Sequence, residues 1–242
     1  MAYAYKWRGP NIVTNGLHLY FDAASPNSYY ADENSTIWKD ISGNNWNGSI
    51  TASYVPASQS FSFNGTDQTI SIDSAATFAG QSQVTINVLW KPASLSAGND
   101  KRIFYEETSS DTYTRIGLEQ DNTSVQLKWR DDNADPQGSG GTLSSTNFLG
   151  AGSTDTFYYI SAIYDSINNR QLIYVDGVFN SQSNITTVAL GTSTTRGLSL
   201  GSAVDWVGYY NECQIACAHI YNRALTADEI LQNYNAVKDR YI

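Results

Sequence analysis

The stretch FYYISAIYD at positions 157–165, followed closely by LIYVDG at 172–177, decides the fold. Both runs are rich in tyrosine, isoleucine and valine, which are residue types that favour β-strands. The Asp176-Gly177 pair is one of the dipeptides that most often form a two-residue hairpin turn. Two apolar strands ending at such a turn are typical of the closing part of a β-sandwich.

The sequence that follows predicts one more strand and then a helix. CQIACAHIY at 213–221 has the composition of a buried strand. Thr226-Ala227-Asp228-Glu229 has the spacing of a capping box, in which the threonine caps the helix and the glutamate binds back to the threonine amide. We expect the helix to pack on the sandwich and to end near Tyr241. Its apolar stripe at helical spacing is Ile230, Leu231, Tyr234 and Val237.

Strand-like patches recur through the rest of the chain with turn signals between them. They lie at 17–22, 61–63, 69–72, 84–90, 103–105, 114–118 and 125–130. Patches of this kind, bounded by Asn-Gly and Gly-rich segments, predict hairpins. The predicted fold is therefore all-β, a two-sheet antiparallel sandwich with a short C-terminal helix. Residues 131–152 are rich in Asp, Gly, Ser and Pro and predict a long loop, with a linker between two domains as the alternative.

Composition excludes several classes of protein. The 242 residues carry a net charge of −9, which argues against a duplex nucleic-acid binder and against attachment to anionic membranes. No run approaches the roughly 18 apolar residues of a membrane span, and the N-terminus lacks the pattern of a signal peptide. Cys213 and Cys217 are four residues apart, so on a regular strand they share one face about 13 Å apart and cannot form a disulfide. Two free thiols suggest assembly in a reducing cytoplasm.

The first residues differ from the rest of the chain. Residues 1–11 are aromatic and mildly basic, fit no strand pattern, and are expected to form an arm ahead of one sandwich domain at 12–242. Either a docking arm or a loose end fits this composition. The adhesive side chains of the arm are Tyr3, Tyr5, Lys6, Trp7 and Arg8.

Five stretches, in this order, resemble a known family. They are GPNIVTNGLHLYFDAASP (9–26), WKDISGNNWNG (38–48), FNGTD (63–67), YVDG (174–177) and IYNRAL (220–225) with the Glu229-Ile230 that follows. Together they resemble the laminin-G-like, or concanavalin-A-like, lectin/glucanase superfamily, in the branch found in bacteriophage (cyanophage-like) structural proteins. The resemblance implies a jelly-roll sandwich of two curved antiparallel sheets.

For several residues of these stretches, we expect a particular packing, pairing or backbone conformation. Trp38 and Trp46 are expected to pack in the sandwich rather than to hold a ligand. Asn222-Arg223 is expected to close a turn before the helix, with Arg223 pairing locally. Positive backbone φ angles are expected at Gly43, Gly48, Gly65 and Gly177.

Glycosidases of this superfamily share a Glu-x-Asp-x-Glu strand motif, which this chain lacks. Glu106 and Glu107 are adjacent and face opposite ways on a strand, Glu119 lacks the third carboxylate, and Glu212 has no carboxylate two or four residues away. The two histidines, His18 and His219, are not at metal-ligand spacing. The protein is therefore predicted not to be an enzyme, and a glycoside hydrolase is kept only as the second alternative.

The resemblance favours a virion structural or decoration protein, on a capsid or tail surface. In this interpretation the chain assembles in the host cytoplasm, forms an oligomer, and uses its arm to bind other virion proteins or sister subunits. Its outer loops are then free to adhere to host surface glycans. The first alternative is a carbohydrate-binding lectin module that is not tied to a virion.

Aromatic residues beside amides and carboxylates are the candidates for glycan binding. The first cluster comprises Asp205, Trp206, Tyr209, Tyr210 and Asn211. Trp129, Arg130, Asp131 and Asp132 at a strand end form a second candidate. The alternative is that these aromatics simply fill the sandwich or its rim. No cofactor is expected, but a structural calcium ion is compatible with the family. Its scattered candidate ligands are Asp22, Asp67, Asp165 and Asp205.

Overall fold

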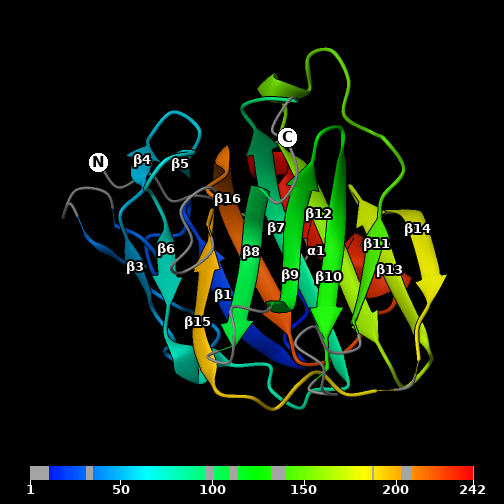
Figure 1. Cartoon of the computed structure of the whole chain (residues 1–242). Helices are drawn as coiled ribbons and strands as arrows, with labels where there is room; N and C mark the ends of the chain where they lie inside the picture. Colours follow the sequence, from blue (N-terminus) through cyan, green and yellow to red (C-terminus); the bar gives the residue numbers. More distant parts are fainter. Residues whose placement is uncertain are drawn as a thin grey trace.

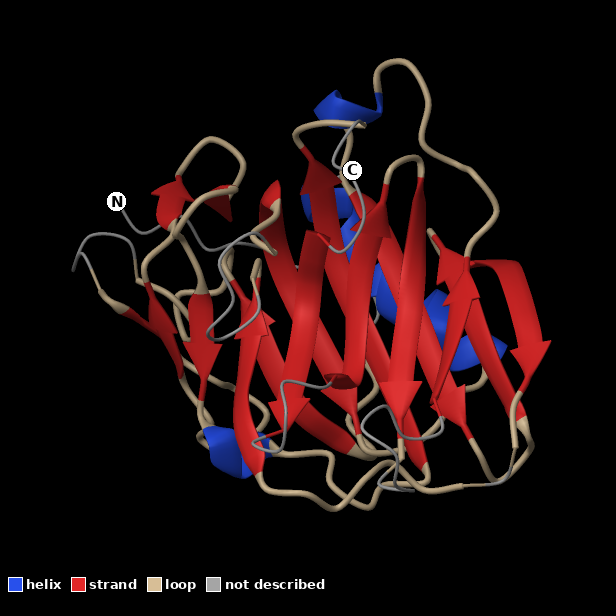
Figure 2. Ribbon diagram, viewed as in Figure 1, coloured by secondary structure: helices blue, strands red, loops and turns tan. Residues whose placement is uncertain are grey.

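Two antiparallel sheets of eight strands each lie face to face in the computed structural model of the chain (Figure 1). The structure describes residues 11–30, 35–95, 101–108, 114–131, 140–186, 188–202 and 209–241. One α-helix, α1 (Ala227–Tyr241), and two short 3-10 helices, η2 (Ser74–Ala76) and η3 (Ser153–Asp155), accompany the strands in these ranges (Figure 2). The predicted all-β sandwich with a C-terminal helix is confirmed.

The strand order mixes distant parts of the chain. Sheet A consists, in spatial order, of β14 (Val178–Asn184), β13 (Arg170–Val175), β12 (Tyr158–Asp165), β7 (Gln83–Pro92), β16 (Glu212–Tyr221), β5 (Ser60–Asn64) and β4 (Ser53–Val55), with β1 (Leu17–Asp22) also paired to β16. Sheet B consists of β11 (Gly140–Ser144), β10 (Ser124–Arg130), β9 (Thr114–Asp121), β8 (Lys101–Thr108), β15 (Thr195–Leu200), β6 (Ile70–Ile72), β3 (Gly48–Ile50) and β2 (Ile37–Trp38).

The main core lies between the two sheets and is rich in aromatic rings. Trp38 is fully buried and stacks on Phe21, with ring centroids 5.0 Å apart, and its ring also contacts Phe61 at 4.6 Å. Trp46 is partly buried against the same core. Both tryptophans of the WKDISGNNWNG stretch therefore pack in the sandwich, as the sequence predicts.

Helix α1 covers the outer face of sheet A, so the strands beneath it are buried on both faces (Figure 1). The capping box forms as predicted: Glu229 N donates to Thr226 Oγ1 over 3.3 Å, and Thr226 N donates to Glu229 Oε2 over 2.9 Å. Arg223 pairs with the same carboxylate, and its side-chain hydrogen bonds lower the pKa of Glu229 to about 2. The local pairing expected for Arg223 is confirmed.

The expected apolar stripe of α1 is wrong at Leu231, whose side chain is 44% exposed. The buried face instead includes Asn233, whose Oδ1 accepts from Val13 N over 2.8 Å and whose Nδ2 donates to Tyr221 Oη over 3.0 Å. An asparagine is stable at this buried position because both polar atoms of its amide group are hydrogen-bonded.

The C-terminal end of α1 is fastened to sheet A by Asp22, which is almost fully buried. Its carboxylate accepts from Arg240 Nη1 over 2.7 Å and from Tyr241 Oη over 2.9 Å. Tyr20 Oη and Ala24 N donate to the same carboxylate. The helix is therefore anchored by a capping box at one end and by a shared carboxylate at the other.

Asp40 shapes the loop that follows β2. Its Oδ1 accepts from Tyr20 N and Ser42 N, both over 2.9 Å, and its Oδ2 accepts from Ser42 Oγ over 2.8 Å and Trp46 N over 3.1 Å. Three backbone N–H groups thus donate to one buried side chain instead of to the carbonyl groups of a neighbouring strand. This explains why an aspartate followed by a Ser-Gly-Asn turn occurs here.

Three glycine positions behave as expected and one does not. Gly43, Gly65 and Gly177 have φ angles of +103°, +70° and +77°. Gly48 does not have a positive φ; its missing side chain matters because a Cβ atom there would lie 2.6 Å from Ile70 Cγ2.

Two further sequence expectations are corrected by the sheets. The segment 131–152 contains a strand, β11, which pairs with β10 at the edge of sheet B. Cys213 and Cys217 do not share a face, because the register of β16 against β7 shifts between Ile215 and Cys217. Cys213 lies in the core between the sheets, whereas Cys217 lies under α1, and both thiols are free.

The predicted arm lies mostly outside the described residues, which begin at Asn11. Asn11 O accepts from Gln232 Nε2 over 2.7 Å, and Ile12 packs against the cluster beneath α1. Tyr3, Tyr5, Lys6, Trp7 and Arg8 are not described. Among the described residues, no helix combines the length and apolar character needed to cross a membrane.

Candidate functional site

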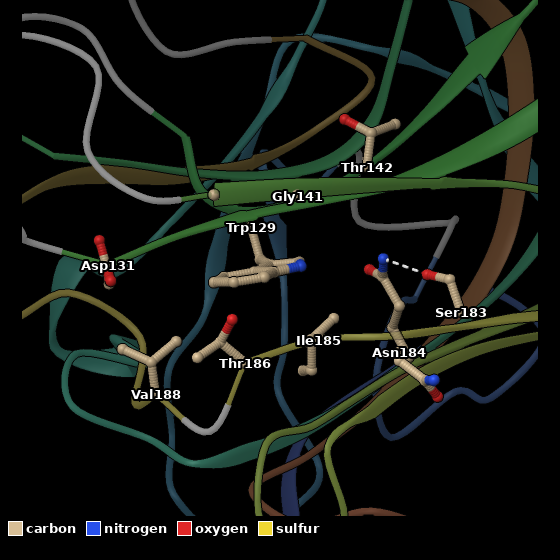
Figure 3. Close-up of a pocket in the computed structure, with 11 residues that line it drawn as sticks. Trp129, Asp131, Gly141, Thr142, Ser183, Asn184, Ile185, Thr186 and Val188 are labelled. Atoms are coloured by element: carbon tan, nitrogen blue, oxygen red, sulfur yellow. Dashed lines mark hydrogen bonds between the residues drawn. The ribbon is translucent and has the colours of Figure 1, made fainter.

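A cavity of about 460 Å³ opens at one end of the sandwich, where β10 and β11 of sheet B meet β13 and β14 of sheet A (Figure 3). Its size is within the usual range of small-ligand sites, about 300–1,000 Å³. We call it the Trp129 cavity. It is lined by Trp129, Asp131, Gly140, Gly141, Thr142, Gln171, Ser183, Asn184, Ile185, Thr186 and Val188.

The indole of Trp129 forms one wall, and Gly141 makes room for it. Trp129 pairs with Gly141 across β10 and β11, and a Cβ atom at Gly141 would lie 2.8 Å from Trp129 Nε1. A Cβ atom at Gly140 would lie 2.6 Å from Trp129 O. The Trp129 ring also rests on Tyr164, with centroids 5.0 Å apart, so its orientation is fixed on two sides.

Two buried polar atoms of this cavity lack a hydrogen-bond partner in the described part of the chain. Trp129 is only 5% exposed and its Nε1–H is unpaired; Gln171 is 2% exposed and its Oε1 is unpaired. Gln171 Nε2 donates to Ser183 Oγ over 2.8 Å, the hydrogen bond dashed in Figure 3, so the amide is held in place. An unmet buried donor or acceptor costs about 1–3 kcal/mol. Both residues line the cavity, and each unpaired atom itself has almost no exposed surface.

The segment that closes the cavity on the other side is fixed by side chains from both sheets. Tyr164 Oη donates to Val188 O. Burial, with a smaller contribution from the charge of Asp131, raises the pKa of Tyr164 to about 12, so this hydroxyl keeps its proton at neutral pH. The cavity wall is thus held before any ligand arrives.

A buried ion pair holds the continuation of this segment. Arg115 is fully buried, forms an ion pair with Glu106, and donates from Nε to Gly191 O over 2.9 Å. Gly191 N in turn donates to Arg130 O over 3.1 Å, at the end of β10. A wall held by a buried guanidinium keeps its shape at little entropic cost when a ligand binds.

The predicted cluster around Tyr209 lies elsewhere. Tyr210 lines a separate hollow of about 350 Å³ with Asn64, Gly65, Thr66, Ser94, Lys101 and Glu212. Tyr209 lies 4.8 Å from the Arg102 guanidinium, and Asn211 is buried with its N–H bonded to Gly201 O. Asp205 and Trp206 lie outside the described residues. The structure therefore does not bring Trp129 together with Tyr209, Tyr210 or Asn211.

Sequence reasoning found Trp129 and Asp131 but missed Gln171 and Ser183, which also line the cavity. Gln171 precedes the apolar run of β13, and Ser183 lies on the edge strand β14, whose polar residues have no apolar pattern to mark it. The available signal was the Gly-Ser-Gly-Gly run at 138–141, since consecutive glycines beside a strand often indicate a close approach to a bulky neighbour.

Two buried acidic side chains of sheet B, Glu106 and Glu119, are paired with cations. Glu106 pairs with Arg115, and Glu119 pairs with Arg102 and Lys128. Among the described residues, no group of three or more His, Cys, Asp or Glu side chains is placed to hold a metal ion. Asp22 and Asp165 bind Arg240 and Arg170, Asp67 accepts from Asn64, and Asp205 is not described.

The sequence of residues 64–231 matches the family model described as the concanavalin A-like lectin/glucanases superfamily. This span is well over half of the chain. The chain belongs to the concanavalin A-like lectin/glucanases superfamily. The superfamily assignment made from the five sequence stretches is confirmed, and the two-sheet sandwich with α1 on its back is this superfamily's architecture in the present chain. Among proteins with curated descriptions, none matches this superfamily member in sequence.

Several solved structures share the fold at low sequence identity. Trypanosoma rangeli sialidase in complex with sialic acid is 15% identical, with a TM-score of 0.68 over 96% of this chain and 35% of that chain. The binding domain of Paraclostridial Mosquitocidal Protein 1 is 15% identical, with a TM-score of 0.66 over 92% of this chain and 52% of that chain. The receptor binding domain of botulinum neurotoxin C/D mosaic serotype is 12% identical, with a TM-score of 0.62 over 93% and 52%. The chain spans about a third to a half of these proteins, and the likeness concerns the fold alone.

Proposed function

We propose that this chain is a non-enzymatic carbohydrate-binding module that holds a saccharide in the Trp129 cavity. The observation that carries the proposal is the pair of unpaired buried atoms, Trp129 Nε1–H and Gln171 Oε1, in a cavity of ligand size. Sugars offer hydroxyls that both donate and accept, and their C–H faces pack on indole rings and on aliphatic side chains such as Val188. Two of the solved structures that share this fold are a binding domain and a receptor binding domain, which is compatible with such a role.

A non-enzymatic role is favoured by the state of the carboxylates. Most glycoside hydrolases use two carboxyl groups facing one another across a sugar, one of them able to give up a proton. Glu106 and Glu119 are instead held in ion pairs with arginine and lysine side chains. The charged residue that lines the Trp129 cavity is a single aspartate, Asp131, which has no second carboxylate beside it among the described lining residues.

We expect Trp129→Phe to weaken saccharide binding about tenfold, because it keeps an aromatic ring but removes the N–H donor, and one such hydrogen bond in a buried site is worth about a factor of ten. A glycan array identifies the saccharide and calorimetry gives the affinity of both proteins. The bound glycan is expected to be recovered intact.

Trp38→Phe is the matched control. Trp38 Nε1 is also buried without a partner in the described chain, but Trp38 lies in the core and lines neither of the two cavities. Its replacement should leave the affinity unchanged. Equal affinity of the Trp129→Phe protein and the parent would count against this cavity as the binding site.

The second candidate function is a virion structural or decoration protein, and the two functions are compatible. It is favoured by the resemblance of residues 9–26 and 38–48 to phage structural proteins. In this proposal the arm binds other virion proteins or sister subunits in an oligomer, while the sandwich presents the cavity to host glycans.

Deleting residues 2–10 tests the virion role. The sandwich should stay folded, because the contacts of Asn11 and Ile12 with α1 remain. Incorporation into particles should be lost, as judged by mass spectrometry of purified virions. Particles that contain the shortened and full-length proteins equally would contradict a docking role for the arm.

A further inference from the structure

One edge of sheet A is formed by β14, a strand of seven residues that carries no charge (Figure 1). β14 pairs with β13 on one side, and on its other side its backbone groups form no hydrogen bond with the described part of the chain. Natural sheets usually protect such an edge with charged side chains, a proline or a very short strand. The opposite edge of sheet A follows this rule, because β4 has three residues and Pro56 follows it. β14 is therefore open to pairing with a further strand.

Exposed apolar side chains lie beside this edge. Val178 and Phe179 of β14 are 67% and 51% exposed, and Leu231 of α1 is 44% exposed. Leu231 lies close to the hairpin that leads into β14, since a Cβ atom at Gly177 would lie 3.1 Å from Leu231 Cδ1. Phe179 packs edge-on against Tyr174, with ring centroids 5.7 Å apart. Large apolar side chains gathered at one surface often mark a protein interface.

The distribution of charge favours a second copy of this chain as the partner. Each copy carries a net charge of −9, so two copies repel one another wherever acidic surfaces meet. A twofold interface also brings identical residues together, which disfavours charged side chains at its centre. None of residues 177–195 is charged. The side-chain amides of Asn180, Gln182 and Asn184 both donate and accept hydrogen bonds, so they are complementary to copies of themselves.

We propose that β14 pairs antiparallel with β14 of a second copy, so that the two A sheets become one continuous sheet across a twofold axis. The irregular register of β14 lies beside Asn180, near the hairpin, and leaves residues 181–184 as a regular segment for this pairing. Phe179 and Leu231 then lie against the other copy, which removes their apolar surface from water.

The dimer has a consequence for the Trp129 cavity, and this consequence rests on the carbohydrate-binding function above. Ser183 and Asn184 of β14 line that cavity, so the paired strands carry one cavity from each copy. Two sites held in one assembly bind a surface that displays many glycans more tightly than one site does, without any new contact within either site.

Sedimentation velocity of the full chain over a range of concentrations tests the dimer, and we expect a reversible monomer–dimer equilibrium. Gln182→Lys places two like charges near the twofold axis and should weaken the dimer at least about tenfold, since like charges brought together at an interface are strongly disfavoured. Ser53→Lys makes the same change in net charge on β4, at the opposite edge of sheet A, and should leave the equilibrium unchanged.

A second pair of variants tests the apolar part of the interface. Phe179→Ser should weaken the dimer about tenfold, because a phenylalanine ring is no longer buried against the other copy. Ile37→Ser is the matched control, since Ile37 is 45% exposed on β2, at the far edge of sheet B from β11. Its replacement should leave the equilibrium unchanged. Circular dichroism and thermal unfolding confirm that each variant is folded.

The possible results separate this interface from the functions proposed above. A chain that stays monomeric at every concentration measured overturns the interface, as does a dimer that Gln182→Lys and Phe179→Ser weaken no more than the controls do. The dimer should persist when residues 2–10 are deleted; its loss would assign it to the arm and overturn the pairing through β14. A monomer that binds glycans leaves the carbohydrate-binding function standing, and a β14 dimer that binds none leaves the interface standing while that function falls.

Discussion

Replacing Asp40 by alanine is expected to lower the free energy of unfolding by about 3–5 kcal/mol, because hydrogen bonds to a charged acceptor contribute about 1.5–3 kcal/mol each and are not fully additive. The carboxylate is 5% exposed and accepts from the backbone N–H groups of Tyr20, Ser42 and Trp46. Alanine leaves those donors without their acceptor in a largely buried loop. Urea unfolding followed by tryptophan fluorescence measures the change.

Asp40→Asn and Asp67→Ala are the controls for this prediction. Asparagine keeps one acceptor oxygen but turns an NH₂ group toward the donors of the other, so an intermediate loss is expected. Asp67 accepts from Asn64 Nδ2 in an exposed corner, and its replacement should cost about 1 kcal/mol or less. A loss at Asp40 no larger than that at Asp67 would show that the loop finds other partners.

Acidification is expected to destabilise the fold through His219, which is fully buried between sheet A and α1. Burial lowers the pKa of His219 from 6.5 to about 3; the nearby Asp22 charge opposes this shift and Arg240 adds to it. The ring Nδ1 lies 3.1 Å from Tyr159 Oη, and Tyr20 packs edge-on against the ring. The folded protein therefore holds a neutral imidazole in a site with no room for a hydration shell.

The sign of the pH dependence follows from the lowered pKa. Below pH 6.5 the unfolded chain binds a proton that the folded chain takes up only near pH 3, so stability falls as the pH drops through this window. The loss due to His219 is about 2 kcal/mol between pH 7 and pH 5. The His219→Phe protein should lose less stability than the parent over that interval by this amount.

The interval from pH 7 to pH 5 separates His219 from Glu229. Hydrogen bonds lower the pKa of Glu229 to about 2, so its contribution to stability is lost only as the pH falls below about 4.5. Equal slopes of stability against pH for the parent and His219→Phe proteins between these limits would mean that the imidazole is not the group responsible.

Local sequence signals predicted those parts of the fold that are held by local contacts. The Asp176-Gly177 turn has φ angles of +51° and +77°, as a tight hairpin requires, and the Thr226–Glu229 capping box forms at the start of α1. Each of these depends on residues within four positions of one another. Strands such as β11 and β14 were not predicted, because their polar edge positions carry no apolar alternation.

The cavity could be predicted only in part. Trp129 stood out as an aromatic residue at a strand end, but its proposed role also involves Gln171 and Ser183, which lie more than forty residues further along the chain. Their approach results from the way the edges of two sheets meet, as in the hydrogen bond of Ser181 Oγ to Ser144 O across the sandwich. No pattern in a single sequence predicts that the edge strands of the two sheets approach each other here.

The single irregularity in β16 has a consequence for the chemistry of the chain. Because one additional residue between Ile215 and Cys217 turns the two sulfur atoms to opposite sides of sheet A, an oxidant cannot join them within one molecule without dismantling the strand. Burial also raises the pKa of both thiols, which keeps them protonated and slow to react. The sandwich is therefore expected to keep the same covalent structure in oxidising and reducing surroundings.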